Sequence, residues 1–157
     1  MQYVDIHDGI EDTLKILNHK LKNGFEIVRE YDRDLPEVSV RSSELNQVWT
    51  NLIDNSIGAI GEGEGGTITL KTYREGPHVM VEIGDDGPGI PEEIQPRVFD
   101  PFYTTKDVGE GTGLGLDVVR RIVTRRCGGQ IDFRSQPGAT VFRVRIPIEG
   151  GRGGDDG

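Results

Sequence analysis

Apolar residues near the N-terminus recur with the period of an α-helix. They stand at Ile6, Ile10, Leu14, Leu17 and Leu21, spaced by four, four, three and four positions. This spacing places them on one face and predicts an amphipathic helix over residues 5–22. A second helical pattern covers residues 44–60, where Ser43 can cap the first turn. Its core-facing positions are Leu45, Val48, Leu52 and Ile53.

Runs rich in β-branched and apolar residues predict the strands. These strands are expected at residues 25–29, 67–73, 78–85, near 130–134 and 140–147. A turn at 75–77 joins the second and third of them into a hairpin, and a third helix is expected over 113–126. Helices interspersed with hairpins favour a two-layer α/β (α+β) sandwich, with a mixed, mostly antiparallel sheet and helices on one face.

The composition of the chain restricts the class of protein to which it can belong. A chain of 157 residues with 34% hydrophobic and 29% charged residues is typical of one globular domain. No apolar run reaches the length of a membrane span, and the N-terminus lacks the regions of a secretory signal. The glycine-rich tail at 150–157 has nothing to bury and is expected to be disordered.

Net charge and cysteine content limit the kinds of binding partner and the compartment that the sequence predicts. A net charge of −9 disfavours nucleic-acid binding, which depends on neutralising phosphates. The arginines at 120, 121, 125 and 126 favour a solvated face or a docking surface. The single Cys127 can form no internal bridge and predicts a partly buried thiol in a reducing cytoplasm. We therefore expect a cytoplasmic domain without nucleic-acid or membrane contact.

Amide side chains share one face of the second predicted helix. Gln47, Asn51 and Asn55 are four residues apart, so they form a single polar stripe. A carboxamide oxygen is a neutral, hard ligand suited to Mg²⁺, which keeps several waters and also binds phosphates. Alone, such a stripe is more often a surface feature; the motifs that follow favour a binding role.

An aspartate and two glycines follow the strand at 78–85, in the sequence DDGPGIP. Gly87 and Gly89 can take positive φ and let a flat ring approach the backbone closely. The Asp85 carboxylate can accept a hydrogen bond from an exocyclic amine such as that of adenine, worth about 1.5–3 kcal/mol. The alternative is an ordinary Asp-Gly turn. Asp86 is not expected to take part.

The sequence GTGLGL at 111–116 opens the third predicted helix. Successive backbone N–H groups at a helix start form an anion-binding concavity. Thr105 and Lys106 precede it, and Lys106 is a candidate phosphate contact, with a solvated loop lysine as the alternative. Phe99 and Phe102 are expected to anchor the intervening loop to the domain.

With these motifs in this order, the chain resembles the catalytic, ATP-binding domain of bacterial sensor histidine kinases. They belong to the Bergerat-fold superfamily shared with type II topoisomerases, mismatch-repair ATPases and a heat-shock chaperone. The resemblance covers about residues 25–148, and the sequences NLIDN, DPFYTTK and GTGLGL are similar to the nitrogen-regulation type. It implies ATP and Mg²⁺ as cofactors, held between the asparagine helix and a lid at about residues 96–112.

The resemblance also implies residue roles. Asn55 is the implied Mg²⁺ ligand, Asp85 the residue that reads adenine, and Asn51 and Lys106 the catalytic pair. These four residues are also implied to contact the nucleotide. Further nucleotide contacts are implied at Gly87, Gly89, Ile90, Thr105, Gly111, Thr112, Gly113, Leu114, Gly115, Leu116 and Thr140.

One position bears on the reaction. Asn51 stands where hydrolysing relatives carry a glutamate that activates water, and an amide cannot act as that base. The resemblance therefore favours transfer of the γ-phosphoryl group to a protein side chain. The implied acceptor is a histidine on a separate dimerisation domain, with a response regulator as an indirect partner. Among the departures, Gly58 replaces a frequent lysine and Ser56 a common alanine.

The acceptor histidine is not expected within this chain. His7–Asp8 imitates the acceptor dipeptide, but the two long helices of an acceptor hairpin are missing. Residues 1–22 are expected to be the end of a helix that links from a missing dimerisation and phosphoacceptor domain, and residues 23–149 the ATP-binding catalytic domain. Autophosphorylation by this chain alone is then not expected.

Three alternative functions stay open. One is a serine-directed kinase of the anti-sigma-factor type, which has the same fold. Another is a nucleotide-responsive binding module without kinase activity. The third, a dimerising ATPase, is disfavoured by Asn51.

Overall fold

The computed structural model describes residues 2–61, 65–100 and 115–149. Its main sheet has five strands in the order β2-β4-β5-β7-β6. They are β2 (Phe25–Glu30), β4 (Gly66–Glu75), β5 (His78–Asp85), β6 (Gln130–Gln136) and β7 (Ala139–Pro147). The β2–β4 pair is parallel and the other three pairs are antiparallel, so the predicted mixed, mostly antiparallel sheet is confirmed.

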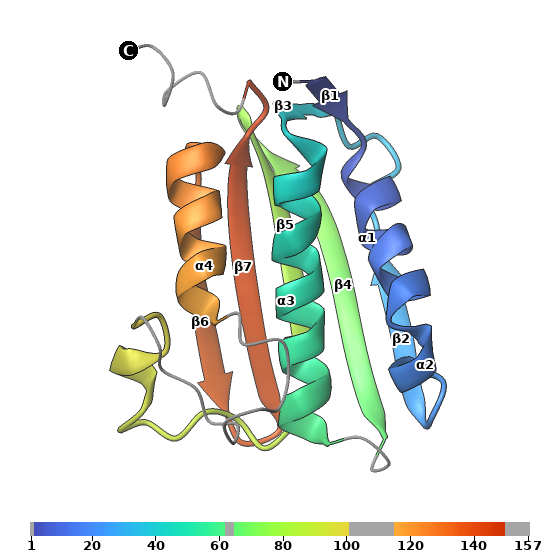
Figure 1. Ribbon diagram of the computed structural model, residues 1–157, viewed down its shortest axis with the longest axis vertical. Coiled ribbons are helices and arrows are strands. Elements are labelled where there is room, and N and C mark those ends of the chain that lie inside the picture. The colour runs from blue at the N-terminus through green and yellow to red at the C-terminus, as the bar shows by residue number, and fades with distance from the viewer. Residues whose placement is uncertain (1, 62–64, 101–114, 150–157) are drawn as a thin grey trace.

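The helices cover one face of this sheet, with α1, α3 and α4 side by side in front of the strands (Figure 1). The helical segments are α1 (Ile6–Ile16), α2 (Asn18–Leu21), α3 (Ser42–Ile60), the 3₁₀ turn η1 (Gln95–Arg97), α4 (Leu116–Arg121) and the π-helical turn η2 (Ile122–Arg126). This is the predicted two-layer α/β sandwich.

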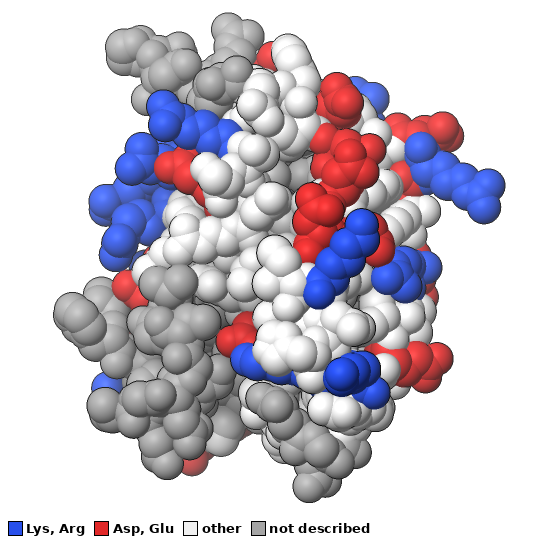
Figure 2. Space-filling view, turned by 45° about the vertical axis from the view of Figure 1, so that its right-hand side comes forward, with Lys and Arg blue, Asp and Glu red and all other residues white. Residues whose placement is uncertain are grey.

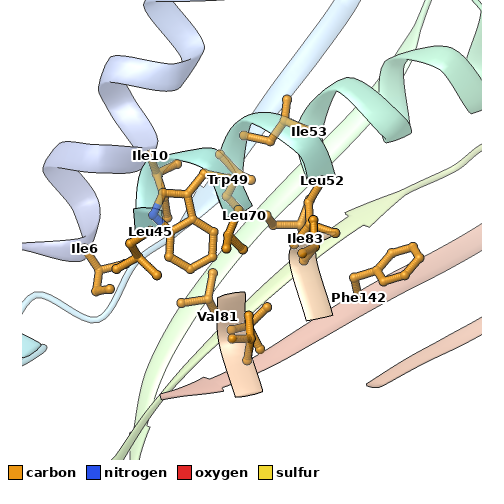
Figure 3. Packing of buried hydrophobic residues seen from close by; sticks show 14 of the residues in the cluster. Ile6, Ile10, Leu45, Trp49, Leu52, Ile53, Leu70, Val81, Ile83 and Phe142 are labelled. Atoms are coloured by element: carbon orange, nitrogen blue, oxygen red, sulfur yellow. The ribbon is translucent and has the colours of Figure 1, made fainter. Parts of the chain in front are cut away.

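The core lies between the two layers and includes the N-terminal helix. Trp49 of α3 packs beside Ile6 and Ile10 of α1, above the strand residues Leu70 and Val81 (Figure 3). All five side chains are 0–1% exposed. Because residues of α1 belong to the same core as α3, the N-terminal helix is packed into the domain and does not project from it.

A glycine permits the close approach of α1 and α3. A side chain at Gly9 would collide with the Asn46 amide oxygen and lie 3.4 Å from the Trp49 ring. A side chain at this position would require the Asn46 side chain to move, so the glycine favours the close packing of α1 on α3.

Three local expectations were wrong or incomplete. The first predicted helix is interrupted at Leu17, where the backbone leaves helical geometry and separates α1 from α2. The expected cap at Ser43 is not made, because α3 already begins at Ser42 and its N-cap residue is Arg41. The third predicted helix changes from α to π geometry at Ile122, a widening that hydrophobic periodicity does not indicate.

A second, two-stranded sheet was not predicted. β1 (Gln2–Val4) pairs antiparallel with β3 (Val38–Val40). Three residues are too few to show a strand period, and the pairing joins segments far apart in sequence. The β3 residue Ser39 also donates its backbone N–H to the Ile148 carbonyl, so this small sheet is joined to the end of the main one.

Charged side chains are unevenly placed on the surface. Figure 2 shows acidic groups in a band along α1 and basic groups toward the side of α4. The four arginines of α4 and η2 are exposed. None of the helices within the described ranges has the length and apolar character needed to cross a bilayer. Cys127 was expected to be a partly buried thiol and is fully buried, and this burial raises its pKa to about 12, with a smaller contribution from Glu44.

A partly buried ion pair ties α2 to α3. Lys20 Nζ lies 2.8 Å from Asp54 Oδ1, and the Asp54 side chain is 8% exposed. Asp54 directly precedes Asn55, so the pair holds the predicted nucleotide helix from the side of the N-terminal segment. A buried carboxylate depends on its partner, because burial removes the water that would otherwise stabilise its charge.

We expect Lys20→Met to lower the free energy of unfolding by about 1–3 kcal/mol, between the values for exposed and fully buried pairs. Urea unfolding followed by Trp49 fluorescence measures this, since Trp49 is the single tryptophan of the chain. Lys22→Met is the matched control, because Lys22 is exposed two residues later. Equal unfolding midpoints for the two variants would show that the pair contributes no stability.

Candidate nucleotide-binding site

The predicted adenine-reading aspartate lies at the end of a central strand. Asp85 is the last residue of β5 and is directly opposite Thr140 in the β5–β7 register. The two side chains are 8% and 4% exposed, respectively. Register thus brings together two residues that are 55 positions apart in sequence and that the family resemblance had assigned to the same base.

Opposing effects act on the pKa of the Asp85 carboxyl group, and their net result is a raised pKa. Burial raises its pKa, and the Gly87 backbone N–H, which donates to Oδ1 at 2.9 Å, opposes that rise. The Ser56 hydroxyl also favours the charged form, although no hydrogen bond of acceptable geometry joins the two side chains. A buried carboxylate of this kind is stabilised by any further donor, such as the amine of an adenine base.

A hydrogen-bond chain fixes the loop after Asp85 against β6 and β7. The hydroxyls of Ser135 and Thr140 are 2.7 Å apart, and Ser135 Oγ accepts the Ile90 N–H at 2.7 Å. The Gln95 amide then donates to the Ile90 carbonyl at 2.8 Å. Ile90 is therefore placed beside Thr140, as expected of residues lining one base. Ser135 and Gln95 were not predicted, because neither belongs to a motif.

The two loop glycines have different reasons to be glycine. Gly89 has φ of +89°, and a Cβ there would lie 2.5 Å from the Gln136 carbonyl oxygen, so the expected positive φ is confirmed. Gly87 does not adopt positive φ; a Cβ there would lie 3.0 Å from Asp85 Oδ1. Its hydrogen atom is needed for the close approach to the carboxylate, and the expectation of positive φ at Gly87 was wrong.

The asparagine stripe lies on α3. Asn51 is 7% exposed, and its Nδ2 has no hydrogen-bond partner within the described part of the chain. Asn55 is half-buried one turn later. A buried amide without a partner fits a site whose missing partner is a ligand oxygen, as a phosphate group would provide.

The donor set fits Mg²⁺ only together with a nucleotide. Among the described residues, no group of three or more His, Cys, Asp and Glu side chains could hold a metal ion. A neutral amide such as Asn55 would then be one ligand among phosphate oxygens and waters, which is how Mg²⁺ is usually bound.

A hollow lies at the end of α3, next to this site. It has a volume of about 450 Å³ and is lined by Ile60, Gly65, Asp86, Gly87, Pro88 and Gly138. Asp86 is held by the Thr67 N–H, which donates to its Oδ1 at 3.0 Å. Asp86 thus has a structural contact at the start of β4. Only Gly87 belongs to both the hollow and the predicted site, so the polar groups and not this hollow define the site.

Several residues of the predicted site lie outside the described residues. They are Thr105, Lys106, Gly111, Thr112, Gly113 and Leu114, and Phe102 lies outside as well. Gly115 is described as the N-cap of α4, with an extended backbone, and Leu116 is its first residue. Phe99 packs edge-on against Phe133 and Phe142, with ring centroids 5.9 and 6.4 Å away, which confirms its anchoring role.

The His7 side chain makes contacts that hold the N-terminal helix to the sheet. Its ring stacks on Tyr31 with centroids 4.2 Å apart, and its Nε2 lies 2.8 Å from Thr72 Oγ1. Tyr31 in turn donates to Glu11, which also binds Arg29, so these side chains tie α1 to β2. The Nε2 of His7 thus has a structural role in holding α1 against the sheet, and the expectation that the phosphoacceptor lies elsewhere stays a prediction.

Proteins of known function that are similar to this chain agree with the geometry of the site. The chain belongs to the histidine kinase-, DNA gyrase B- and HSP90-like ATPase family, whose model matches residues 40–150. It is 36% identical over 155 residues to the sensory histidine kinase/phosphatase NtrB of Klebsiella oxytoca, covering 91% of this chain and 43% of that protein. The predicted resemblance to sensor histidine kinases of the nitrogen-regulation type is thereby confirmed.

Solved structures show the same fold. The catalytic domain of histidine kinase ThkA is 32% identical, with a TM-score of 0.82 over 95% of this chain and 97% of that one. ThkA in complex with the response regulator TrrA matches with 28% identity and a TM-score of 0.79, covering 94% of this chain and 41% of that one. The chain spans less than half the length of the curated NtrB relatives it matches.

Proposed function

We propose that this chain is the ATP- and Mg²⁺-binding catalytic domain of a two-component sensor histidine kinase. It would transfer the γ-phosphoryl group of ATP to a histidine on a separate dimerisation domain. The observation that carries this proposal is the pairing of the buried Asp85 with Thr140, together with the Asn51 Nδ2 on α3, which has no hydrogen-bond partner among the described residues. Membership of the ATPase family supports the nucleotide.

Each described residue would have a separate task. Asp85 would accept the adenine amine, with Gly87, Gly89 and Ile90 along the base and Thr140 behind it. Asn55 would hold Mg²⁺, which when bound neutralises phosphate charge. Asn51 would orient the phosphate chain and, lacking basicity, would not activate water. Lys106, Thr105 and the glycine segment 111–116 are proposed on the phosphate side.

The partners and boundaries are also proposals. Residues 1–22 would lead from the dimerisation domain, residues 23–149 would form the catalytic domain, and 150–157 a disordered tail. A response regulator would receive the phosphoryl group from the histidine and contact this chain only indirectly. A cytoplasmic location stays a prediction, which cell fractionation would test.

Phosphotransfer to an added acceptor tests the proposed reaction. The chain would be incubated with Mg²⁺ and γ-labelled ATP, with and without the purified helical hairpin domain of a nitrogen-regulation kinase. We expect label on the hairpin only, labile in acid and stable in base, as phosphohistidine is. His7→Gln should label the hairpin as well as the unmodified chain does, because His7 already serves α1 packing.

Other results would favour the alternative functions. Acid-stable label on a serine would indicate a serine-directed kinase. ATP binding without label on any hairpin would indicate a nucleotide-responsive binding module. Rapid phosphate release with ATP-dependent dimers would indicate a hydrolysing ATPase and contradict the role given to Asn51.

A further inference from the structure

An acidic side chain is buried on the outward side of α3, beside the predicted phosphate contact. Asp54 is two positions from Leu52 and two from Ser56, so it lies about 200° around the helix from these buried residues. Despite this outward position, Asp54 is only 6% exposed. Asn51, three positions earlier, is its neighbour on the helix surface, and Asn55 follows it directly.

A negative charge at Asp54 would oppose the proposed ligand. The phosphate chain of ATP stays negative when Mg²⁺ is bound. Asn51 is the proposed contact of that chain, so a carboxylate next to Asn51 would repel the ligand. Burial strengthens such a repulsion, because less water lies between the two charges. An acidic side chain at this position therefore requires an opposite charge nearby if ATP is to bind well.

The N-terminal segment supplies that opposite charge. Lys20 Nζ lies 2.8 Å from Asp54 Oδ1, and the lysine side chain is 25% exposed. Lys20 belongs to α2, which lies at the same end of the helical layer as the C-terminal half of α3 (Figure 1). Leu17 and Leu21, on either side of Lys20, are 6% and 5% exposed, so the core holds this short helix in place. The fold thus brings a positive charge to the nucleotide helix from a residue 34 positions away in sequence.

We propose that Lys20 is a charge-compensating residue of the nucleotide site, which acts through Asp54 and lets the phosphate chain of ATP approach α3. The inference rests on the function proposed above. Lys20 does not need to touch the ligand, because its effect is to neutralise the carboxylate that would repel the phosphates. A displacement of α2 away from α3 would then weaken the binding of the phosphates and leave the binding of the base unchanged.

Comparing ATP with adenosine tests this inference, because adenosine has the base and the sugar but no phosphate. Calorimetry in Mg²⁺ measures the affinity for ATP, and chemical-shift titration by NMR measures the weaker affinity for adenosine. Lys20→Met should bind ATP about three- to tenfold more weakly, the effect of one uncompensated unit charge near a protein surface. Its affinity for adenosine should equal that of the unmodified chain.

Variants of Asp54 separate charge compensation from structural damage. Asp54→Asn removes the repelling charge and keeps Lys20, so it should bind ATP at least as tightly as the unmodified chain. The double variant Lys20→Met/Asp54→Asn lacks both charges and should regain the ratio of ATP to adenosine affinity that Lys20→Met loses. A structural role alone would make the double variant as weak as Lys20→Met or weaker.

Lys22→Met is the matched control, because it changes the net charge by the same amount at an exposed site two residues later. It should bind ATP and adenosine as the unmodified chain does. Lys20→Gln provides a second neutral variant, so the test survives if the methionine variant does not fold. Its loss of ATP affinity should equal that of Lys20→Met.

Three outcomes would overturn the inference, and they differ in what they leave standing. If Asp85→Asn weakens ATP binding while both Lys20 variants match Lys22→Met, Lys20 has no role in the site and the proposed function stands. If the Lys20 variants and the double variant lose ATP and adenosine affinity equally, the pair acts only through the stability of the fold. If Asp85→Asn also binds ATP normally, the assigned nucleotide site is wrong together with the role of Lys20.

Discussion

Asp85→Asn should weaken ATP binding by about ten- to a hundredfold, because a hydrogen bond to a charged acceptor is worth about 1.5–3 kcal/mol. The amide keeps the shape of the side chain and can still accept the Gly87 N–H, so the loop is retained. Isothermal titration in the presence of Mg²⁺ measures the change. Asp86→Asn is the matched control, since Asp86 accepts a backbone N–H from Thr67. Unchanged ATP affinity in Asp85→Asn would refute the assigned role.

The same substitution should leave the nucleotide-free domain at least as stable at neutral pH. Burial raises the pKa of Asp85 in the folded chain, so the folded state disfavours the charged form. The stability of the wild-type chain, compared with that of the Asp85→Asn variant, therefore falls as the pH rises. The fall begins near the pKa of Asp85 in the unfolded chain, about 3.9, and ends above its raised pKa in the folded chain. The gap in thermal midpoint between the variant and wild type should close below about pH 4, where both states are protonated. A variant less stable at pH 7 would show that the charge of Asp85 is favoured by the fold itself.

Asn55→Ala should remove most of the Mg²⁺ dependence of ATP binding and lower phosphotransfer by about a hundredfold or more, the usual effect of losing one contact that stabilises developing charge. The reason is that Asn55 supplies the proposed protein ligand of the metal, while phosphates and water supply the rest. Titration of ATP with and without Mg²⁺ measures the first effect, and label transfer to the hairpin domain the second.

Gln47→Ala is a suitable control for Asn55→Ala. Gln47 is on the same polar stripe of α3, two turns earlier, and is partly buried as Asn55 is. It should retain both the Mg²⁺ dependence and the transfer rate. If ATP binding by Asn55→Ala still strengthens with Mg²⁺ as in wild type, another group holds the metal.

Much of the local structure could be predicted from residue patterns. The hairpin of β4 and β5 and the long α3 helix were expected within a few residues of their observed bounds. These elements are long and strongly periodic, so the signal is repeated several times within each. The motif at Asp85 indicated a loop directly after a strand, and the structure has Asp85 as the last residue of β5 with Gly89 at positive φ.

Features that depend on contacts between distant segments could not be predicted. The β1–β3 pairing and the Lys20–Asp54 ion pair each join residues that no common local pattern connects. Their side chains are polar or their segments short, so neither a hydrophobic period nor a known motif indicates them.

The amino-acid sequence by itself determined the sandwich architecture, the family and the positions of Asp85, Asn51 and Asn55 as candidate ligands. Only the tertiary structure decided that Asp85 faces Thr140, that the buried Asn51 Nδ2 lacks a hydrogen-bond partner within the described ranges, and that the N-terminal helix shares the core. The physical reason is that periodicity and motif spacing are local, and they indicate only which face of a helix or strand is buried. Strand register and helix crossing depend on the close packing of whole side chains from distant segments.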